Sequence, residues 1–348
     1  MTRALITGGA GFFGGVLAAH LRSAGWEIAL LDRLGDAGME QQFPLARADL
    51  TRPDEIEAAF AHLGKQEIVF HCAALMGHEF PDPNEVWRHN VEGTRNLAAA
   101  AVRHGVRKIV YTSSICVFGR GYDHPVTEDE PVNPIETYGK SKLEAERILL
   151  GPEASVPAAA LRVPTIVSPG RLGLLTILFE FIAEGRRIYM VGGGRNRYQF
   201  VYAGDLAEAC RLAALAPGSA LYNVGADRVR PLREVYQAVI DHAGSRSRLV
   251  SLPRAATTGA LRALYAMGVS PLGPYHYRMI SESFIFDTTR IRNELGWRPT
   301  RTGEEVLCEA YEYWRENRAA IEAAARQDVS AHKRGSRMGV IRLVKWLS

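Results

Sequence analysis

Short apolar runs alternate along the chain with longer segments in which apolar residues recur every three or four positions. The short runs predict strands at 4–7, 27–32, 68–72, 108–113, 159–163 and 221–224. The helical spacing predicts helices between them at 14–24, 53–63, 84–104 and 137–150. Strands separated by helices imply right-handed crossovers, so the pattern predicts an α/β fold built on a doubly wound parallel sheet.

The later part of the chain is less regular. Helical spacing returns at 174–185, 232–243 and 303–318, which predicts a smaller, mixed α/β C-terminal region. We therefore expect a sheet-forming domain at 1–165, a second region at 166–317 with strand and helix elements that return to the sheet, and a tail at 318–348.

Composition narrows the class of protein. The chain has 348 residues, of which 47% are hydrophobic and 23% charged, as in soluble globular proteins. No apolar run reaches the roughly 18 residues that span a bilayer, and the N-terminus lacks the pattern of a signal peptide. The cysteines are scattered, which favours reduced thiols over a disulfide frame or a zinc site: Cys72, Cys116, Cys210 and Cys308. We expect a cytoplasmic protein that binds no metal.

The net charge of +4 is concentrated in the tail, where no acidic residue follows Asp328 and five basic residues do. Because the rest of the chain is nearly neutral, no nucleic-acid-binding surface is expected. Residues 332–348 also carry one helical stripe of apolar residues beside the basic ones: Val340, Leu343, Val344 and Leu347. Two interpretations stay open, a helix that makes peripheral membrane contact and a helix that docks on the protein itself.

The first strand leads directly into a glycine-rich loop, TGGAGFFG at 7–14. Gly9, Gly11 and Gly14 fit G-x-G-x-x-G, and Gly8 with Gly11 and Gly14 fits G-x-x-G-x-x-G. Between a strand and a helix, such a loop lets the backbone approach a pyrophosphate, which the helix N-terminus stabilises. The sequence therefore predicts a dinucleotide site.

An acidic residue ends the second strand and bears on the choice of dinucleotide. Asp32 lies 18 residues after Gly14, where a carboxylate binds the ribose hydroxyls of NAD and repels the 2′-phosphate of NADP. Its neighbour Arg33 can pair with that phosphate, so NADP remains the alternative to NAD. Asp49, followed by Leu50, either contacts the adenine or caps the helix that begins at Pro53.

Tyr138 and Lys142 open a predicted helix and lie four residues apart, on one face. A nearby ammonium favours phenolate and lowers the pKa of the phenol, which suits acid–base work on a hydroxyl. Ser113 and Ser114 end the strand before this helix, at the edge of the sheet where hydroxyls face the crevice. His71, inside an apolar strand, is expected to be a buried structural residue.

Together these motifs resemble the extended short-chain dehydrogenase/reductase family, of the NAD-dependent sugar-nucleotide epimerase/dehydratase type. The matching segments include TGGAGFFG, VFHCAAL, TSSICVFG, YGKSK, FVYAGDLA and ELGWRP. The resemblance implies a Rossmann domain at 1–165, a substrate-binding region at 166–317, and Ser114, Tyr138 and Lys142 as a catalytic triad. It implies a cofactor site made of the acidic residues named above and these others: Gly8, Gly11, Phe12, Phe13, Gly14, Arg33, Leu50, Cys72, Ala73, Ala74, Leu75, Asn90, Ser113, Val163 and Pro164.

The same resemblance implies a reaction and an assembly. Hydride would pass from a secondary hydroxyl of a nucleotide sugar to NAD while Tyr138 takes the proton, and an epimerase would return it to the opposite face. The family forms homodimers through the helices at 84–104 and 137–150; here their apolar residues supply a surface or pack internally: Val91, Leu97, Val102, Leu143, Ile148 and Leu149. The candidate substrate residues are Met76, Cys116, Thr165, Arg171, Arg195 and Arg197.

Four departures from the family pattern narrow the chemistry. Ile115 and Cys116 stand where the 4,6-dehydratases carry an acidic pair, and a decarboxylase-type Glu is missing, so elimination and decarboxylation are disfavoured. Tyr198 stands where many members carry an Arg for the diphosphate, and Thr165 where many carry Asn. The last two resemble the 3β-hydroxysteroid-dehydrogenase-like branch. An oxidoreductase acting on a lipid or sterol-like alcohol is therefore the alternative to a nucleotide-sugar epimerase.

Overall fold

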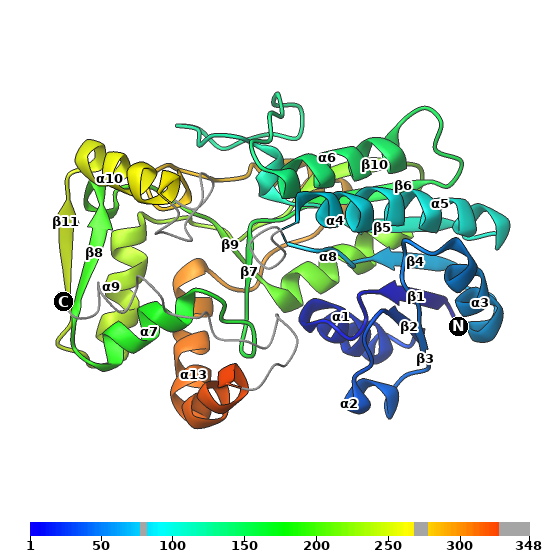
Figure 1. Ribbon diagram of the computed structural model, residues 1–348, viewed down its shortest axis with the longest axis horizontal. Coiled ribbons are helices and arrows are strands. Elements are labelled where there is room, and N and C mark those ends of the chain that lie inside the picture. Colours follow the sequence, from blue (N-terminus) through cyan, green and yellow to red (C-terminus); the bar gives the residue numbers. More distant parts are fainter. Residues whose placement is uncertain (77–81, 268–277, 327–348) are drawn as a thin grey trace.

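The computed structural model describes residues 1–76, 82–267 and 278–326, and it is built around a parallel sheet of seven strands (Figure 1). The strand order is β10-β6-β5-β4-β1-β2-β3, which doubles back from β1 and confirms the doubly wound α/β fold. The strands are β1 (Arg3–Thr7), β2 (Glu27–Asp32), β3 (Leu45–Arg47), β4 (Ile68–His71), β5 (Lys108–Thr112), β6 (Ala158–Arg162) and β10 (Ala220–Asn223).

Helices cover both faces of this sheet (Figure 1). On one face, α1 (Phe12–Ser23) and α8 (Ala203–Leu215) pack together over Ile6 and Phe70. On the other lie α3 (Pro53–Leu63), α5 (Gly93–Arg103) and α6 (Thr137–Leu150), whose apolar residues pack on Leu5 and Val69. Successive strand residues point to opposite faces, so Leu5 and Ile6 belong to different cores. Two short helices lie outside these layers, α2 (Ala37–Glu40) and α12 (Thr289–Leu295).

The six predicted strands match the structure to within one residue at each end. β3 was not predicted, because its three residues are too few to show a period. The helix expected at 84–104 is interrupted: α4 (Pro83–Trp87) and α5 are joined by a π-helical turn, η1 (Arg88–Glu92). The last helix also differs, because α13 (Gly303–Arg326) continues past 318, so the boundary expected there falls inside a helix.

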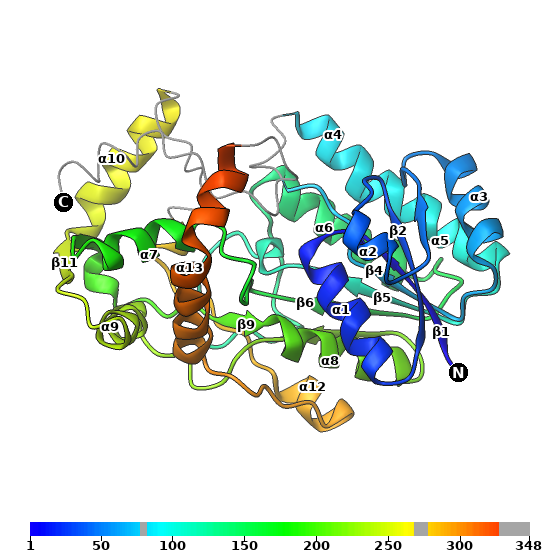
Figure 2. The same ribbon diagram turned by 90° about the horizontal axis from the view of Figure 1, so that it is seen from below.

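A second lobe follows the sheet domain (Figure 2). Its apolar core also takes in side chains from the sheet domain, among them Ile115 and Leu143. The lobe pairs β7 (Thr165–Val167) with β9 (Phe200–Tyr202) and β8 (Arg187–Val191) with β11 (Arg248–Leu252), both in parallel. Its helices are α7 (Leu175–Ala183), α9 (Leu232–His242), α10 (Arg254–Ala266) and α13, and a 3₁₀ turn, η3 (Gly192–Gly194), follows β8. After β9 the chain returns to the first domain, where α8 packs on α1 and β10 extends the sheet.

Most of the apolar residues expected on a dimer surface are internal. Leu97 and Leu149 are buried because α5 and α6 turn them onto the sheet, Leu143 is buried in the core of the second lobe, Val91 is buried on η1, and Ile148 is half-buried. Val102 is 50% exposed, and Trp87 on α4 is 38% exposed. Of these side chains, Val102 and Trp87 are the ones exposed enough to contribute apolar surface to a dimer.

The tail expected to touch a membrane, 332–348, lies outside the described residues. Within the part of the chain that the structure describes, no helix combines the length and the apolar character needed to span a bilayer.

Candidate active site

The glycine loop joins β1 to α1 and is packed against the end of β4. Gly8 has φ of +69°, and a Cβ there would come within 2.8 Å of the Ala73 nitrogen. A Cβ on Gly14 would lie 2.2 Å from the Gly8 carbonyl oxygen. Gly11 begins α1 without a side-chain cap, and the first turn holds no acidic residue. The free N–H groups and the positive end of the helix dipole fit a pyrophosphate.

Two phenylalanines follow the loop. Phe13 is buried in the core under α1, whereas Phe12 is partly buried and packs near Gly170 at the start of the second lobe. Phe12 therefore contributes to the contact between the two lobes at the mouth of the loop.

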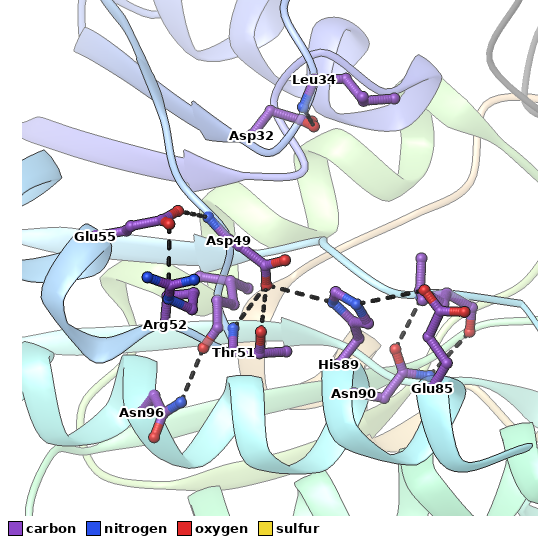
Figure 3. Close-up of polar contacts among 12 residues, drawn as sticks. Asp32, Leu34, Asp49, Thr51, Arg52, Glu55, Glu85, His89, Asn90 and Asn96 are labelled. Carbon is purple, nitrogen blue, oxygen red and sulfur yellow. Dashed lines mark hydrogen bonds and ion pairs between the residues drawn. The ribbon is translucent and has the colours of Figure 1, made fainter.

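Asp32, at the end of β2, is tied to the glycine loop. One carboxylate oxygen accepts a hydrogen bond from the Ala10 N–H at 3.0 Å. The other accepts from the Leu34 N–H, also at 3.0 Å (Figure 3). Burial raises the pKa of Asp32, and these backbone donors act against that rise. The carboxylate is thereby held beside the loop, where ribose hydroxyls would lie, while Arg33 is exposed.

Asp49 turns back onto its own loop rather than capping α3. Its Oδ1 accepts from both the N–H and the hydroxyl of Thr51 at 2.8 Å, and His89 Nδ1 lies 3.6 Å away (Figure 3). The capping position before α3 is occupied by Arg52, so the capping interpretation of Asp49 is wrong. The bonds from Thr51 lower the pKa of Asp49 against its burial, which keeps the carboxylate charged where the adenine is expected.

The π-helical turn η1 places Asn90 against the chain that leaves β4. The Asn90 side chain accepts from the Leu75 N–H at 2.8 Å and donates to the Leu75 carbonyl at 2.9 Å. It also donates to the hydroxyl of Ser141, which in turn bonds the Tyr138 carbonyl. Asn90 therefore ties the expected cofactor path to the first turn of α6. The sequence did not reveal this turn, because π-helical geometry has no periodic signature.

The neighbours of Leu75 form the same half-buried segment after β4. Cys72 lies at its start, and burial raises the pKa of this thiol to about 11, so the sulfur stays protonated. The Ala73 N–H donates to the Thr7 hydroxyl oxygen at 3.4 Å, and Ala74 and Met76 follow it. His71, before them, is buried between the hydroxyls of Thr7 and Thr94, as expected for a structural residue.

Lys142 is the buried centre of the candidate site. It is 3% exposed, and its Nζ donates to the Thr112 carbonyl at 2.7 Å. The ammonium lies 4.6 Å from the centroid of the Tyr111 ring and 5.9 Å from that of Tyr138. Burial lowers the pKa of Lys142 to about 8. Tyr138 is half-buried at the start of α6, so the structure brings these two side chains together.

Ser114 follows β5 and caps a 3₁₀ turn, η2 (Ile115–Val117). Its Oγ accepts from the Cys116 N–H at 3.1 Å, which leaves the hydroxyl proton free to be donated. Cys116 is half-buried, and its carbonyl packs so closely on Gly139 that a Cβ there would lie 2.2 Å away. The turn and the first turn of α6 are thus in direct backbone contact.

Ser113, expected at the cofactor, has its hydroxyl directed elsewhere. It donates to Glu146 Oε1 at 2.5 Å, inside the core. Val163 and Pro164 are buried at the end of β6, and the Val163 carbonyl accepts from the Ile115 N–H at 2.8 Å. Leu50 is also buried, with its carbonyl bonded by Asn96.

Thr165 and Tyr198, which differ from the residues that many family members carry there, contact each other in the second lobe. The hydroxyls of Thr165 and Tyr198 lie 2.8 Å apart, and Tyr198 is 3% exposed. The Tyr198 ring packs edge-on against Phe200 and Phe284. The position expected to hold an Arg is therefore part of the apolar core of the second lobe.

Of the three candidate arginines, Arg195 lines a cavity of about 560 Å³, together with Arg120, Arg254, Asn196 and Glu282. Arg171 follows β7 and Arg197 is exposed; neither lines this cavity. Arg120 and Arg254 were missed by the sequence reasoning, because they lie on segments that only the fold brings together. Among the described residues, no three His, Cys, Asp or Glu side chains are grouped as metal ligands.

Comparisons with known proteins agree with this arrangement. Residues 4–225 match the model of the NAD dependent epimerase/dehydratase family. An uncharacterized protein, y4nG, of Sinorhizobium fredii is 35% identical over 322 residues, 91% of this chain and 80% of that protein. The UDP-glucose 4-epimerase of Streptomyces lividans is 27% identical over 89% of this chain and 95% of its own length.

Two further similarities bear on cofactor and substrate. The Thermus thermophilus UDP-glucose 4-epimerase, solved in complex with NAD, superposes with a TM-score of 0.73 at 26% identity, covering 90% of this chain and 99% of its own. The decarboxylating sterol-4-alpha-carboxylate 3-dehydrogenase of Saccharomyces cerevisiae is 34% identical over 174 residues, 48% of this chain and 49% of that protein.

Two adjacent glycines of α1 should respond oppositely to alanine. At Gly14 the added Cβ meets the Gly8 carbonyl at 2.2 Å, so Gly14→Ala should lower the free energy of unfolding by about 1–3 kcal/mol. At Gly15 the nearest atom is the Met39 sulfur at 3.5 Å, so Gly15→Ala should raise it by up to about 1 kcal/mol, as in any helix. Denaturant unfolding of both variants checks this, and equal effects would show that the loop is not tightly packed.

Proposed function

The chain belongs to the NAD dependent epimerase/dehydratase family, and on that premise we propose that it acts on a secondary hydroxyl of a nucleotide sugar, as an epimerase or oxidoreductase, with Tyr138 as acid/base. It is an extended short-chain dehydrogenase/reductase, and its cofactor is NAD. One observation carries the choice of substrate: the arginine-lined cavity begins on the loop that continues from Ser114 through η2.

The cofactor is assigned to the glycine loop and the strand ends beside it. The pyrophosphate would lie at the N-terminus of α1, and Asp32 would bind the ribose hydroxyls. The Oδ1 of Asp49 is taken by Thr51, so its second oxygen is assigned to the adenine end. When bound, NAD supplies the hydride acceptor and, in epimerisation, the donor. The Ser113 side chain is left out of this assignment because it donates to Glu146, and Phe13 and Leu50 are left out because their side chains are buried in the core.

The proton is assigned to the residues around Lys142. Its ammonium, held by the Thr112 carbonyl, lies beside the Tyr138 ring and favours the phenolate, so Tyr138 can take a proton from a substrate hydroxyl. Ser114 accepts from the Cys116 N–H, and its own proton is left for the substrate oxygen. The buried position of Lys142 excludes water, which strengthens its effect on the phenol.

The substrate would extend from this point into the cavity. At about 560 Å³ it has the size of a small-molecule site, and its lining includes three arginines and two carboxylates, Asp123 and Glu282, of which Glu282 lies 3.9 Å from Arg254. Phosphate groups on the nucleotide would pair with the arginines, Arg195 among them. Met76, Cys116 and Thr165 remain candidates for the sugar and Arg171 for its charged end, whereas Arg197 lies outside the cavity.

A lipid or sterol-like alcohol is the second candidate. It is favoured by the apolar cluster of Tyr198, Phe200 and Phe284, where a charged side chain would hold a diphosphate, and by the sterol dehydrogenase that is similar over half of the chain. We also propose a homodimer through α4 and α5, where Trp87 and Val102 are exposed.

The substrate class is tested by a substrate screen combined with variants of two neighbouring arginines, Arg195 and Arg197. NAD-loaded protein is assayed for turnover of nucleotide sugars and of sterol-like alcohols. Arg195→Gln should raise the KM for a nucleotide sugar by about 10–100-fold, because a charge-assisted bond to phosphate is lost. Arg197→Gln, which lies outside the cavity, should leave it within about two-fold. Turnover of sterol-like alcohols alone would replace the first candidate by the second.

Removing the phenol should stop the reaction without weakening the cofactor. Tyr138→Phe should lower kcat by about 10²–10⁴-fold, the usual effect of losing an acid–base group, with NAD affinity within a few-fold. Steady-state turnover assays measure the change in kcat, and titration with NAD measures the change in cofactor affinity. A variant that keeps more than about a tenth of the wild-type rate would assign the proton to another group.

The activity should fall on the alkaline side as Lys142 loses its proton. Because burial lowers its pKa to about 8, the ammonium and its stabilisation of the phenolate are present below that pH and lost above it. A profile of kcat against pH should therefore decline through about pH 8, and Lys140→Met, an exposed change on the same helix, should not alter it. A decline only near the ordinary lysine value of about 10.4 would contradict the assignment.

A further inference from the structure

A buried ion pair between Glu146 and Arg162 lies behind the face of α6 that carries Tyr138 and Lys142. Neither residue has a role in the reaction as proposed above. Arg162 Nη2 donates to Glu146 Oε2 at 2.8 Å, and Arg162 Nε donates to Oε1 at 3.0 Å. The two side chains are 4% and 5% exposed. Ser113 adds its hydroxyl to the same Oε1 at 2.5 Å, so the carboxylate is held by three bonds. Such a pair is costly to bury unless the geometry is good, which this bidentate arrangement satisfies.

The pair continues the stripe that carries the catalytic side chains. Tyr138, Lys142 and Glu146 follow one another at intervals of four residues, so they lie on one face of α6. Two of them bond successive residues at the end of β5: Lys142 to the Thr112 carbonyl and Glu146 to the Ser113 hydroxyl. The next residue is Ser114. The rotation of α6 relative to β5 is therefore fixed at two points, one turn apart.

Arg162 also reaches toward the wall of the arginine-lined cavity. Its guanidinium lies 5.2 Å from the centroid of the Phe118 ring, and its Nη1 donates to the Glu128 carbonyl at 3.2 Å. Phe118 packs edge-on against Tyr122, which lines the cavity. The ion pair thus joins the catalytic helix to the loop on which the substrate would rest.

We infer that Glu146 and Arg162 are positioning residues, which fix the rotation of α6 and balance the charge felt by Tyr138 and Lys142. The inference rests on the proposed function, because it gives these side chains a part in the same proton transfer. Neither residue touches the reacting atoms; both act through Lys142 and Tyr138.

The charge balance follows from the groups around Lys142. Facing it are Cys72 after β4, Cys116 on η2, Tyr111 on β5, and Tyr138 and Glu146 on α6. His71 lies near it as well and is neutral, because burial lowers its pKa to about 3. The Glu146 carboxylate favours the charged form of Lys142, against the burial that lowers its pKa. Arg162 offsets this carboxylate, so removing either partner alone leaves a net charge behind the helix.

The test measures the titration of Tyr138 from the ultraviolet absorbance of its phenolate, with NAD bound. For each variant, the spectrum of the same variant carrying Tyr138→Phe is subtracted, so that only the signal of Tyr138 remains. Glu146→Gln leaves the Arg162 charge, so the apparent pKa of the Tyr138–Lys142 pair should fall. Arg162→Met leaves the Glu146 charge, so it should rise. Eight residues separate Tyr138 from Glu146, about 12 Å along the helix, so each shift should be at most about one pH unit. The double variant should titrate near wild type.

Matched changes on the exposed side of the same helix give the controls. Glu144 and Arg147 form an exposed pair, with 30% and 66% of their side chains accessible. Glu144→Gln and Arg147→Met remove the same charges and should leave the titration unchanged. Leu149→Ala, a buried apolar change on α6, should lower stability without moving it. With a turnover substrate, the double variant should lower kcat while KM stays within about two-fold, because the bidentate grip on α6 is lost.

Opposite shifts that cancel in the double variant support the inference. Shifts in the same direction, or none, would overturn it and reduce the pair to a structural role. If one single variant does not fold, the other still carries a predicted direction, and Arg162→Lys, which keeps the charge, must titrate as wild type. Because the titration needs no substrate, its outcome stands even if no nucleotide sugar is turned over, and failure of the substrate screen leaves it intact.

Discussion

All seven strands of the sheet run in one direction, and their carboxyl ends therefore meet at a single edge. Every candidate cofactor and catalytic group depends on that constraint. β1 delivers the glycine loop, β2 ends at Asp32, β4 leads into the Leu75 segment and β5 into Ser114. The loop packs so closely on the end of β4 that a side chain at Gly8 would meet the backbone of Ala73. A parallel sheet thus creates one crevice from segments that are far apart in the sequence.

The proton transfer proposed for that edge depends on Lys142, which is almost entirely removed from water. A buried ammonium is costly, and the structure offsets the cost with the Thr112 carbonyl, the ring of Tyr111 and the carboxylate of Glu146 further along α6. Burial nevertheless brings the pKa of Lys142 down to about 8. Low local polarity lets the lysine lose its proton more easily than in water. It also strengthens the effect of the ammonium charge on the neighbouring phenol. The tethers that hold α6, from Asn90 through Ser141 and from Arg162 through Glu146, fix where that charge lies.

In the second lobe, apolar packing determines which positions can carry the charged side chains that would bind a diphosphate. Tyr198 bonds Thr165 and packs on Phe200 and Phe284, so this point of the lobe is core. Positive charge is gathered instead at the cavity of Arg120, Arg195 and Arg254, which come from three separate segments. A loop from the sheet domain lines this cavity together with the second lobe, so a substrate held there, as proposed, would contact the segment that follows Ser114.

Local patterns in the sequence determined the fold and much of the site. Alternating periodicities gave the six longer strands and most helices, because burial against a sheet imposes period on the chain. Glycine spacing, Asp32 and the four-residue interval from Tyr138 to Lys142 are likewise local, and they predicted a dinucleotide site and an acid–base pair. What the tertiary structure alone decided involves contacts between distant segments. These are the π-helical turn that brings Asn90 to Leu75, the inward path of Ser113 to Glu146, the arginines of the cavity and the burial of apolar residues expected on a surface. A sequence records which side chains are present and at what spacing, whereas their partners depend on how far each helix turns as it packs on the sheet.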